Sequence, residues 1–513
     1  MRLRCATDLE LFAALFFPHY CTREFNPFHR DLFKSIRFGE RNVRRVRAAP
    51  RGAAKSTLAT LIKPIHDVCY GLEKFILIIS NTTPLANKKL KDIRAEVLAN
   101  GALRAFFGVR FPTKKPGESE FVVHSRAGSC HFAALGRGSE VRGIRVGEAR
   151  PSKIILDDVE HSDEVYNEKI REKTLDWFSE DVTKAGDSGT NIEFVGTVLH
   201  KDSLLAKLLN NPSYTGKVYQ AILSWSERED LWNEWRTIYR SLDDPDRLEK
   251  AQAFYERNKE EMLRGTAVLW PEKESYLDHM KDMEEIGKRA FMKEKQNDPQ
   301  GSDDQIFQTF HWYKERPDGL LVESSQALIP WRELISIGCI DPATGQGSAK
   351  NMGDFTCILT GYKHPPTKRV FVHHDWTKRA PPSTYIGTIF DLHARFKYEQ
   401  FSVETNLYRD LLLPNIQAER KRREEQGKQK IELAFYDCVQ TENKMERIFR
   451  LEPKVNFGHV VFNRALSRQF MMQLEEVPKG THDDCPDALE QLYSLANNRY
   501  KPAGVSISAT AGR

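Results

Sequence analysis

Residues 46–57 read VRAAPRGAAKST and run on into the apolar stretch LATLIKPI. A Pro-Arg-Gly turn signal at positions 50–52 comes shortly before Lys-Ser-Thr at positions 55–57. A tight turn followed by a lysine and a hydroxyl at a helix start suits a triphosphate, because backbone N–H groups and the helix N-terminus face the anion. In such a loop the lysine reaches the outer phosphates and the hydroxyl binds Mg²⁺. The stretch predicts a phosphate-binding loop formed by Arg51, Gly52, Ala53, Ala54, Lys55, Ser56 and Thr57.

The loop departs from the usual G-x-x-x-x-G-K-[ST] pattern. That pattern would place glycines at Ala49 and Ala54, whereas the glycine here is Gly52. Lys-Ser-Thr at a helix start is also ordinary capping chemistry. The loop by itself therefore leaves two interpretations open, nucleotide binding and helix capping.

A second stretch favours nucleotide binding. Residues 151–160 read PSKIILDDVE, a short apolar run that ends in carboxylates and is typical of a buried parallel strand. Open α/β sheets place their chemistry at the carboxyl ends of such strands. One of the acids Asp157, Asp158 and Glu160 can hold Mg²⁺ there, and a neighbouring acid can activate the attacking water. The alternative is a strand followed by an acidic turn, but the two motifs in this order predict a nucleoside triphosphatase.

Composition indicates an ordinary globular protein with several domains. The chain has 513 residues, which predicts two or three domains, and 40% of them are hydrophobic while 29% are charged. The net charge is only +5, so nucleic-acid binding would depend on local basic patches. Eight single cysteines without a C-x-x-C pair argue against a disulfide framework or a zinc site, and fit a reducing compartment. The short run LFAALFF follows Asp8 and Glu10, so neither a signal peptide nor a membrane span is predicted.

The order of elements predicts a mostly parallel, doubly wound sheet in the first part of the chain. Residues 75–80 (FILIIS) and 192–199 (IEFVGTVL) have the pattern of buried strands, and a helix is predicted over residues 84–98. Strands alternating with helices are characteristic of α/β folds. The first 45 residues and residues 202–325 are predicted to be mainly helical.

A glycine–arginine block precedes the acidic strand. Residues 135–151 read LGRGSEVRGIRVGEARP, with four arginines and only Glu140 and Glu148 to pair with them. Arginine is well suited to phosphate recognition, so the block is predicted to face nucleotide or DNA. The alternative for Arg142 is a simple ion pair with Glu140 or Glu148.

A second set of acidic residues begins after residue 331. Strands are predicted over residues 334–340, 354–361, 369–373 and 401–406, with Asp341 ending the first and Glu404 near the end of the last. Residues 481–489 open a helix that carries Asp483, Asp484 and Asp487. Acids at strand ends and at a helix start can converge on a pair of divalent metals that clamp a phosphodiester. Each acid alone could instead be a turn former, a helix cap or an ion-pair partner.

Together the two sets resemble the large terminase subunit of tailed bacteriophages over roughly residues 20–500. The resemblance is carried by PRGAAKST, GRGSEVRGIRV with RPSKIILDDVE, FVGTVLH, FMKEKQNDP, DPATG with GDFTCILTGY, and HDDCPDAL. It implies an α/β fold with an N-terminal P-loop (ASCE/RecA-like) ATPase domain containing a parallel sheet, followed by an RNase H-like nuclease domain. The implied division is an ATPase core at residues 1–205, a helical subdomain and linker at 206–330, a nuclease at 331–498 and a disordered tail at 499–513.

The resemblance also implies roles for individual residues. It places Lys55 with Ser56 or Thr57 on the phosphates and metal, and Asp157 on Mg²⁺. It assigns activation of the attacking water to Asp158 or Glu160, and places Arg142 on the nucleotide of a neighbouring subunit. Gly196-Thr197 resembles the motif that couples hydrolysis to movement. The implied nuclease metal ligands are Asp341, Glu404, Asp483, Asp484 and Asp487.

The implied cofactors are ATP and Mg²⁺, with Mn²⁺ possible in the nuclease. The implied partners are double-stranded DNA, the portal protein of the procapsid, the small terminase subunit and further copies of the chain in a ring. No membrane is involved, and the expected location is the host cytoplasm during virus assembly, not the mature virion.

Two other functions fit parts of the pattern. A helicase-like ATPase fused to a repair or recombination nuclease would carry a second ATPase-like domain, but the later α/β segment carries acids instead. A degenerate ATP-binding scaffold would have lost catalytic residues, whereas Lys55, Asp157, Asp341 and Glu404 are all present.

Overall fold

The structure is a computed structural model that describes two compact units. Unit 1 comprises Met1–Glu229 with Lys259–Gly301, and unit 2 comprises Asp230–Asn258 with Ser302–Arg513. The described residues are 2–34, 40–112, 116–299, 305–342, 355–404, 413–427, 433, 435–438, 443–480, 482–497 and 501–502. Residues 206–330, expected to form one helical subdomain, are shared between the two units.

Unit 1 is built on a seven-stranded sheet with the order β3-β4-β2-β5-β6-β1-β7. Only β3 runs antiparallel to its neighbour, β4, so the predicted mostly parallel sheet is confirmed. The strands are β1 (Arg44–Ala48), β2 (Phe75–Ser80), β3 (Glu120–Ser125), β4 (Gly128–Gly136), β5 (Lys153–Asp157), β6 (Asn191–Gly196) and β7 (Thr215–Val218).

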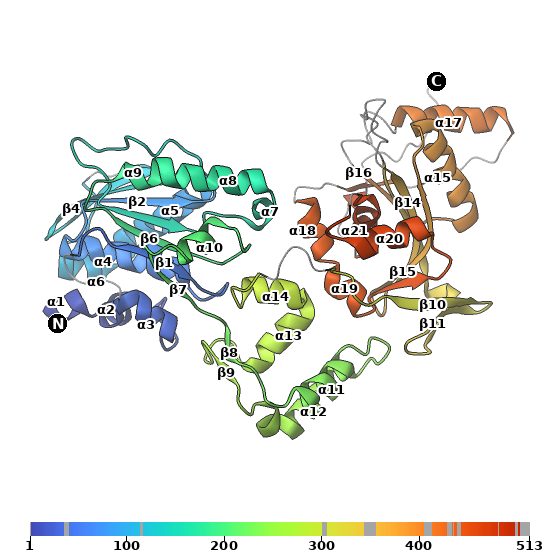
Figure 1. The fold of residues 1–513 in the computed structure, drawn as a ribbon, viewed down its shortest axis with the longest axis horizontal. Helices are drawn as coiled ribbons and strands as arrows, with labels where there is room; N and C mark the ends of the chain where they lie inside the picture. The colour runs from blue at the N-terminus through green and yellow to red at the C-terminus, as the bar shows by residue number, and fades with distance from the viewer. Residues whose placement is uncertain are drawn as a thin grey trace. The chain divides into compact units, whose positions relative to one another are not determined.

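Both faces of this sheet are buried under helices, as strands with continuous apolar runs require. Within β2, Ile76 and Ile78 point into one core, whereas Leu77 and Ile79 point into the other. The first core is covered by α1 (Arg2–Thr7), α2 (Leu9–Phe16), α3 (Pro27–Lys34), the helical stretch η1 (Thr57–Ile62), α4 (Lys63–Tyr70), α5 (Thr83–Ala99) and α6 (Gly101–Phe107). The second is covered by α8 (Glu168–Trp177), η2 (Phe178–Val182), α9 (Thr183–Ala185) and α10 (Leu204–Leu209), with α8 and α9 opposite α1–α3 (Figure 1).

Unit 2 is built on a mixed sheet of ten strands with the order β12-β11-β10-β18-β15-β14-β13-β16-β17-β19. The predicted meander is present as β13, β14 and β15, and β16 lies parallel to β13. The strands are β10 (His311–Arg316), β11 (Gly319–Val322), β12 (Leu328–Pro330), β13 (Ile335–Asp341), β14 (Thr356–His364), β15 (Arg369–Lys378), β16 (Gln400–Glu404), β17 (Phe435–Cys438), β18 (Val460–Asn463) and β19 (Lys501–Pro502).

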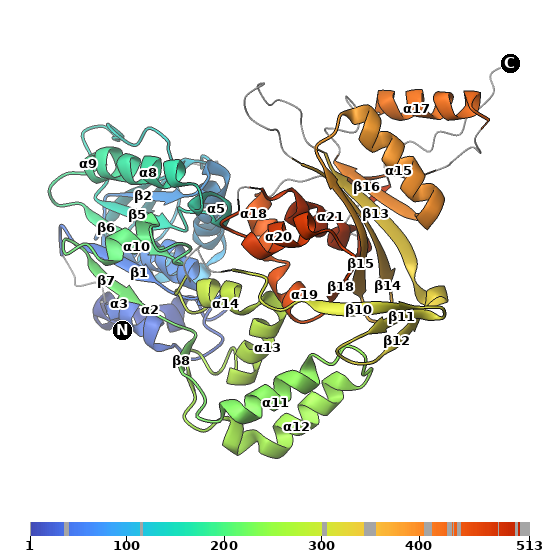
Figure 2. The same ribbon diagram turned by 45° about the vertical axis from the view of Figure 1, so that its right-hand side comes forward.

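Helices cover both faces of the second sheet as well. Figure 2 shows α15 (Pro382–Phe396) and α17 (Leu413–Glu425) on the side of the sheet opposite α21 (Asp484–Ala496). The face of α21 is shared by α18 (Lys444–Phe449), α19 (Glu452–Asn456) and α20 (Arg468–Glu476). The helix α21 is buried along almost its whole length, which fixes the acidic residues of its first turn against the sheet.

Three expectations about secondary structure need correction. The helical prediction for the first 45 residues is wrong at its end, because Arg44 already belongs to the strand β1, which β6 and β7 pair on both sides. Residues 202–325 are helical only in part: α10, α11 (Glu229–Tyr239), α12 (Arg247–Met262), α13 (Tyr276–Ile286) and α14 (Lys288–Glu294) are interrupted by β7, β8 (Ile222–Ser224), β9 (Ala267–Val268), β10 and β11. In the tail, residues 501–502 pair with β17, and the rest of residues 499–513 lies outside the described residues.

Among the described residues, no helix combines the length and the apolar character needed to cross a bilayer.

Candidate nucleotide and nuclease sites

The loop after β1, which the sequence predicts to bind phosphate, has two residues in the left-handed region of the backbone. Gly52 has a φ of 88°, and Ala54, where the usual pattern has a glycine, has a φ of 58°. A left-handed conformation costs a residue with a Cβ atom roughly 1–2 kcal/mol, so the surrounding contacts must hold Ala54 in place. The helix that follows starts at Lys55 and continues through η1 and α4 to Tyr70.

Lys55 lies inside this loop and faces the end of the neighbouring strand β6. Its Nζ donates to the carbonyl oxygen of Ala49 at 2.8 Å and to Oγ1 of Thr197 at 2.8 Å. Burial lowers the pKa of Lys55, while the carboxylates of Asp158 and Asp157 favour its charged form. The structure thus joins the predicted lysine to Thr197, the residue after β6.

Asp157 ends β5 and points toward the start of the loop helix. Its side chain is completely buried, and its Oδ2 forms an ion pair with Nζ of Lys89, a residue of α5. The same Nζ lies 3.3 Å from Oγ of Ser56. Oδ1 of Asp157 is buried and has no hydrogen-bond partner among the described residues. A carboxylate and a hydroxyl that share one cation, with a further oxygen unpaired, fit a Mg²⁺ site.

The two candidate bases after β5 have different surroundings. Asp158 is exposed and has a φ of 48°, and desolvation and the adjacent Asp157 raise its pKa. Glu160 is buried, and its two oxygens accept hydrogen bonds from the backbone N–H groups of Leu204 (2.7 Å) and Leu205 (3.0 Å). Glu160 therefore caps α10, which leaves Asp158 as the carboxylate open to a water molecule.

Contacts that the sequence did not reveal hold the loop in place. The ring of His29 accepts from the backbone N–H of Asn26 at Nδ1, so its Nε2–H donates to the carbonyl of Ala53 at 3.0 Å. Burial lowers the pKa of His29 to about 4, so the ring stays neutral at physiological pH. The backbone N–H of Arg51 donates to the carbonyl of Glu294 at 2.9 Å.

The block FMKEKQNDP also supports the segment after β6. Oδ1 of Asn297 accepts from the backbone N–H of Val198 at 2.9 Å, and its Nδ2 donates to the carbonyl of Tyr219 at 2.7 Å. The chain around Thr197 is therefore tied to the end of unit 1. In the sequence, the turn pattern Asn-Asp-Pro at residues 297–299 could have indicated that Asn297 has a structural role.

Arg142 lies on the loop between β4 and β5 and is exposed. The neighbouring Val141 is fully buried and anchors the loop, and Nε1 of Trp177 donates to the carbonyl of Ser139 at 3.1 Å. Among the described residues, no ion pair links Arg142 to Glu140 or Glu148. The guanidinium is thus presented at the surface of unit 1.

In unit 2, the ends of β13 and β16 lie side by side. Cys339 pairs with Ser402 in this parallel register, and two residues further along each strand are Asp341 and Glu404. The side chain of Glu404 lies outside the described residues, as do the predicted segments at 343–354 and 405–406 and residue 481. The backbone therefore places the two predicted strand acids at one edge of the sheet.

Lys444 of α18, which sequence reasoning missed, lies among three of the predicted acids. Its Nζ is 2.8 Å from Oδ1 of Asp483, 3.4 Å from Oδ2 of Asp487 and 3.8 Å from Oδ2 of Asp341. Burial alone would lower the pKa of Lys444, but the three carboxylates outweigh it and raise the pKa. The carboxylates are thus brought together around one positive charge.

Other groups contact Asp484 and the second carboxylate oxygen of Asp487. Oδ2 of Asp484 accepts from the backbone N–H of Phe355 at 3.2 Å, and Oδ1 of Asp487 is 2.9 Å from a guanidinium nitrogen of Arg447. As they stand, the described residues include no group of three or more His, Cys, Asp or Glu side chains arranged to hold a metal ion. A metal at this edge would have to take the place of the Lys444 ammonium.

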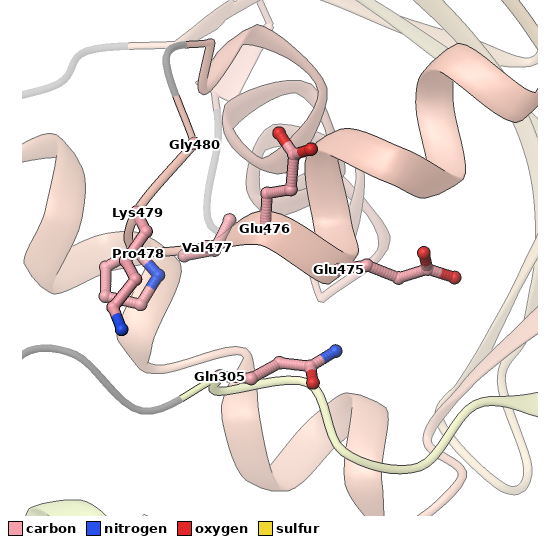
Figure 3. Close-up of a pocket in the computed structure, with 7 residues that line it drawn as sticks. All are labelled: Gln305, Glu475, Glu476, Val477, Pro478, Lys479 and Gly480. Atoms are coloured by element: carbon pink, nitrogen blue, oxygen red, sulfur yellow. The ribbon is translucent and has the colours of Figure 1, made fainter.

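A pocket of about 550 Å³ lies at the turn between α20 and α21 (Figure 3). It is lined by Gln305, Glu475, Glu476, Val477, Pro478, Lys479 and Gly480. None of the predicted site residues lines it. The pocket is therefore separate from the carboxylates around Lys444.

Comparison with known proteins identifies a fold but no sequence relative. No protein-family model matches the sequence, and no curated protein sequence matches it either. The large terminase of a thermophilic bacteriophage, solved in complex with ADP, is similar in structure with a TM-score of 0.50 at 8% identity, over 93% of this chain and 100% of that chain. The HK97 bacteriophage large terminase gives a TM-score of 0.34 at 13% identity, over 96% and 99% of the two chains. The ATPase domain of the Thermus phage P74-26 large terminase gives 0.28 at 15% identity, over 44% of this chain and 89% of that one.

The likeness to the ADP-bound terminase covers 93% of this chain, so it extends over both units. The α/β class is confirmed, with a mostly parallel sheet of seven strands in unit 1 and a mixed sheet of ten strands in unit 2. The chain therefore has the fold of a bacteriophage large terminase.

Proposed function

We propose that this chain is a terminase large subunit, which uses ATP to drive double-stranded DNA into procapsids and cuts concatemeric DNA with a metal-dependent endonuclease. The observation that carries the proposal lies at the carboxyl edge of the parallel sheet, where Lys55 donates to Thr197 and where Ser56 and Asp157 share the ammonium of Lys89. A second α/β unit with acids at its own strand ends supports the nuclease half of the proposal.

In the ATPase unit, the loop from Arg51 to Thr57 would bind the phosphates of ATP through its N–H groups and the helix N-terminus. Lys55 would leave the carbonyl of Ala49 and meet the outer phosphates, where its charge stabilises the transition state. Ser56 and Asp157 would hold Mg²⁺, which neutralises the charge that develops on the phosphates. Thr197, already bonded to Lys55, would sense the state of the nucleotide.

We assign water activation to Asp158, because both oxygens of Glu160 are engaged at the start of α10. A raised pKa makes the Asp158 carboxylate a better proton acceptor at neutral pH. Arg142 would reach the nucleotide of a neighbouring subunit in a ring.

In the nuclease unit, Asp341 and Glu404 together with Asp483 and Asp487 would hold Mg²⁺ or Mn²⁺, which supplies the Lewis acid for phosphodiester cleavage. Asp484 is the weaker candidate, since it accepts from the Phe355 N–H. The proposal includes the domain division expected from the sequence, with an ATPase core at residues 1–205, a helical subdomain and linker at 206–330 and a nuclease at 331–498.

The partners proposed for this chain are double-stranded DNA, a portal protein and a small terminase subunit. The ring of copies would form on the portal of the procapsid, in the host cytoplasm, and would not remain in the mature virion.

The direct test is to incubate the purified chain with plasmid and Mn²⁺, with and without ATP. Phosphate release and plasmid cutting are both expected. Lys55→Ala should lower ATP turnover at least about a hundredfold, the loss typical of one electrostatic stabiliser, and should spare DNA cutting. The exposed Lys169→Ala on α8 is the matched control. Wild-type turnover by Lys55→Ala would refute the assignment of the phosphate loop.

A matched pair of substitutions distinguishes the two candidate bases. Asp158→Asn should lower ATP hydrolysis about 10²–10⁴-fold, as expected for loss of a general base. Glu160→Gln should preserve hydrolysis but weaken the cap of α10, lowering the free energy of unfolding by roughly 0.5–2 kcal/mol. The measurements are phosphate release at saturating ATP and thermal unfolding followed by circular dichroism. If Glu160→Gln abolished hydrolysis without loss of stability, the roles would be reversed.

A further inference from the structure

Lys89 of α5 lies at the place where the proposed ATPase site would hold its metal. It is in the second turn of the helix and is only 16% exposed. Its Nζ forms an ion pair with Oδ2 of Asp157 and lies 3.3 Å from Oγ of Ser56. These two side chains are the ones that the proposed function assigns to Mg²⁺. One ammonium group therefore contacts both of the metal's protein ligands.

The other polar groups near Asp157 do not replace this cation. Thr60 donates a neutral hydrogen bond from Oγ1 to Oδ2 of Asp157 at 3.3 Å. Lys55 bonds to the carbonyls of Ala49 and Pro50 and to Thr197. Lys89 is thus the cation that the described residues pair directly with the Asp157 carboxylate.

A completely buried carboxylate needs a compensating charge, because transfer of an unpaired charge from water is very costly. Lys89 supplies that charge within the protein. Mg²⁺ would supply it equally well and would also bind the phosphates of a nucleotide. Both cations cannot occupy one position, and lysine has a flexible four-carbon stem that allows its ammonium to move away.

We propose that Lys89 is an internal counter-cation that neutralises Asp157 when Mg²⁺ is absent and competes with Mg²⁺ for the same position. The inference rests on the proposed ATPase function and adds to it a residue that sets the metal requirement. Displacement of Lys89 by Mg²⁺ bound to nucleotide would also free an ammonium on α5 beside the phosphate loop. The site would then keep its charge balance in both states.

The competition makes a quantitative prediction. If only a fraction of molecules has Lys89 displaced, the apparent affinity for Mg²⁺ is reduced by that fraction. Removal of the ammonium should therefore raise the apparent affinity, by about tenfold if about a tenth of the molecules are displaced. Without Mg²⁺ the same change should weaken nucleotide binding, because the Asp157 carboxylate then faces the phosphates without a counter-charge.

The test measures binding of a fluorescent ATP analogue to the full chain by anisotropy, once in EDTA and once during a Mg²⁺ titration. Lys89→Met keeps the apolar stem and removes the charge. We expect this variant to bind the analogue about tenfold more weakly in EDTA and to need about tenfold less Mg²⁺ for half-maximal binding. Its melting temperature in EDTA without nucleotide should be lower than that of wild type. Lys89→Arg keeps a positive charge and should behave like wild type in EDTA.

Lys91→Gln, exposed on the same helix, is the matched control and should change neither titration. The proposal would be overturned if Lys89→Met changed the affinity for the ATP analogue in the same direction in EDTA and in Mg²⁺, or did not change it at all. If Lys89→Met did not fold, Lys89→Gln would replace it. The proposal would then be overturned if Lys89→Arg had a higher apparent affinity for Mg²⁺ than Lys89→Gln. Absence of nucleotide binding by wild type at every Mg²⁺ concentration would refute the ATPase function itself.

Discussion

Asp341→Asn is expected to abolish DNA cleavage while ATP hydrolysis continues at the wild-type rate. Asp341 ends β13 beside the end of β16, and its Oδ2 is 3.8 Å from Nζ of Lys444. The substitution keeps the volume of the side chain but removes a charge that the proposed metal ions require. Metal ions contribute several kcal/mol of transition-state stabilisation, which corresponds to roughly a thousandfold or more in rate.

The measurement is plasmid nicking over time with Mg²⁺ and, separately, with Mn²⁺, alongside phosphate release. Asp318→Asn is a suitable control, because Asp318 is an exposed aspartate in the turn between β10 and β11 of the same unit. Circular dichroism of both variants excludes a folding defect as the cause. Nicking by Asp341→Asn at the wild-type rate would refute the proposed metal site.

Arg142→Ala is expected to bind ATP normally but to lose hydrolysis in the assembled motor. An arginine supplied by a neighbouring subunit is worth roughly 10³–10⁵ in rate in other nucleotidases. Arg142 is exposed on a loop anchored by the buried Val141, and it is not paired with Glu140 or Glu148 in the described part of the chain. The free chain should for the same reason hydrolyse ATP slowly and become active on a portal.

The decisive measurement is the ATPase activity of assemblies in which the two variant subunits are mixed. Assemblies that contain both Arg142→Ala and Lys55→Ala subunits bring an intact phosphate loop beside an intact arginine, so part of the ATPase activity should return. Arg145→Ala, on the same loop and also exposed, is the control and should retain activity. No recovery at any ratio, in assemblies shown to be mixed, would place the action of Arg142 within its own subunit.

Much of the architecture was predictable because the signals for it are local. The pattern FILIIS predicted the strand at residues 75–80, and the structure has β2 over Phe75–Ser80. The acidic ends of β5 and β13 were likewise evident as apolar runs that end in aspartate. The strand β1 was not predicted, because its arginines make its sequence look polar. In the structure, Val46 and Ala48 are fully buried and Arg47 forms an ion pair with Asp31.

The sequence by itself determined which residues could carry the chemistry, whereas the tertiary structure decided how their charges are balanced. Strand ends and helix starts follow from neighbouring residues, so Lys55, Asp157 and Asp341 could be placed at them from sequence alone. The partner of Asp157 is Lys89, which is 68 positions away along the chain, and Lys444 joins acids from a strand and a helix. No local pattern distinguishes these lysines from exposed ones, because their surroundings exist only once helices pack against the strand ends. The same packing brings the backbone N–H groups of Leu204 and Leu205 to Glu160, so both oxygens of this predicted candidate base accept hydrogen bonds at the start of α10.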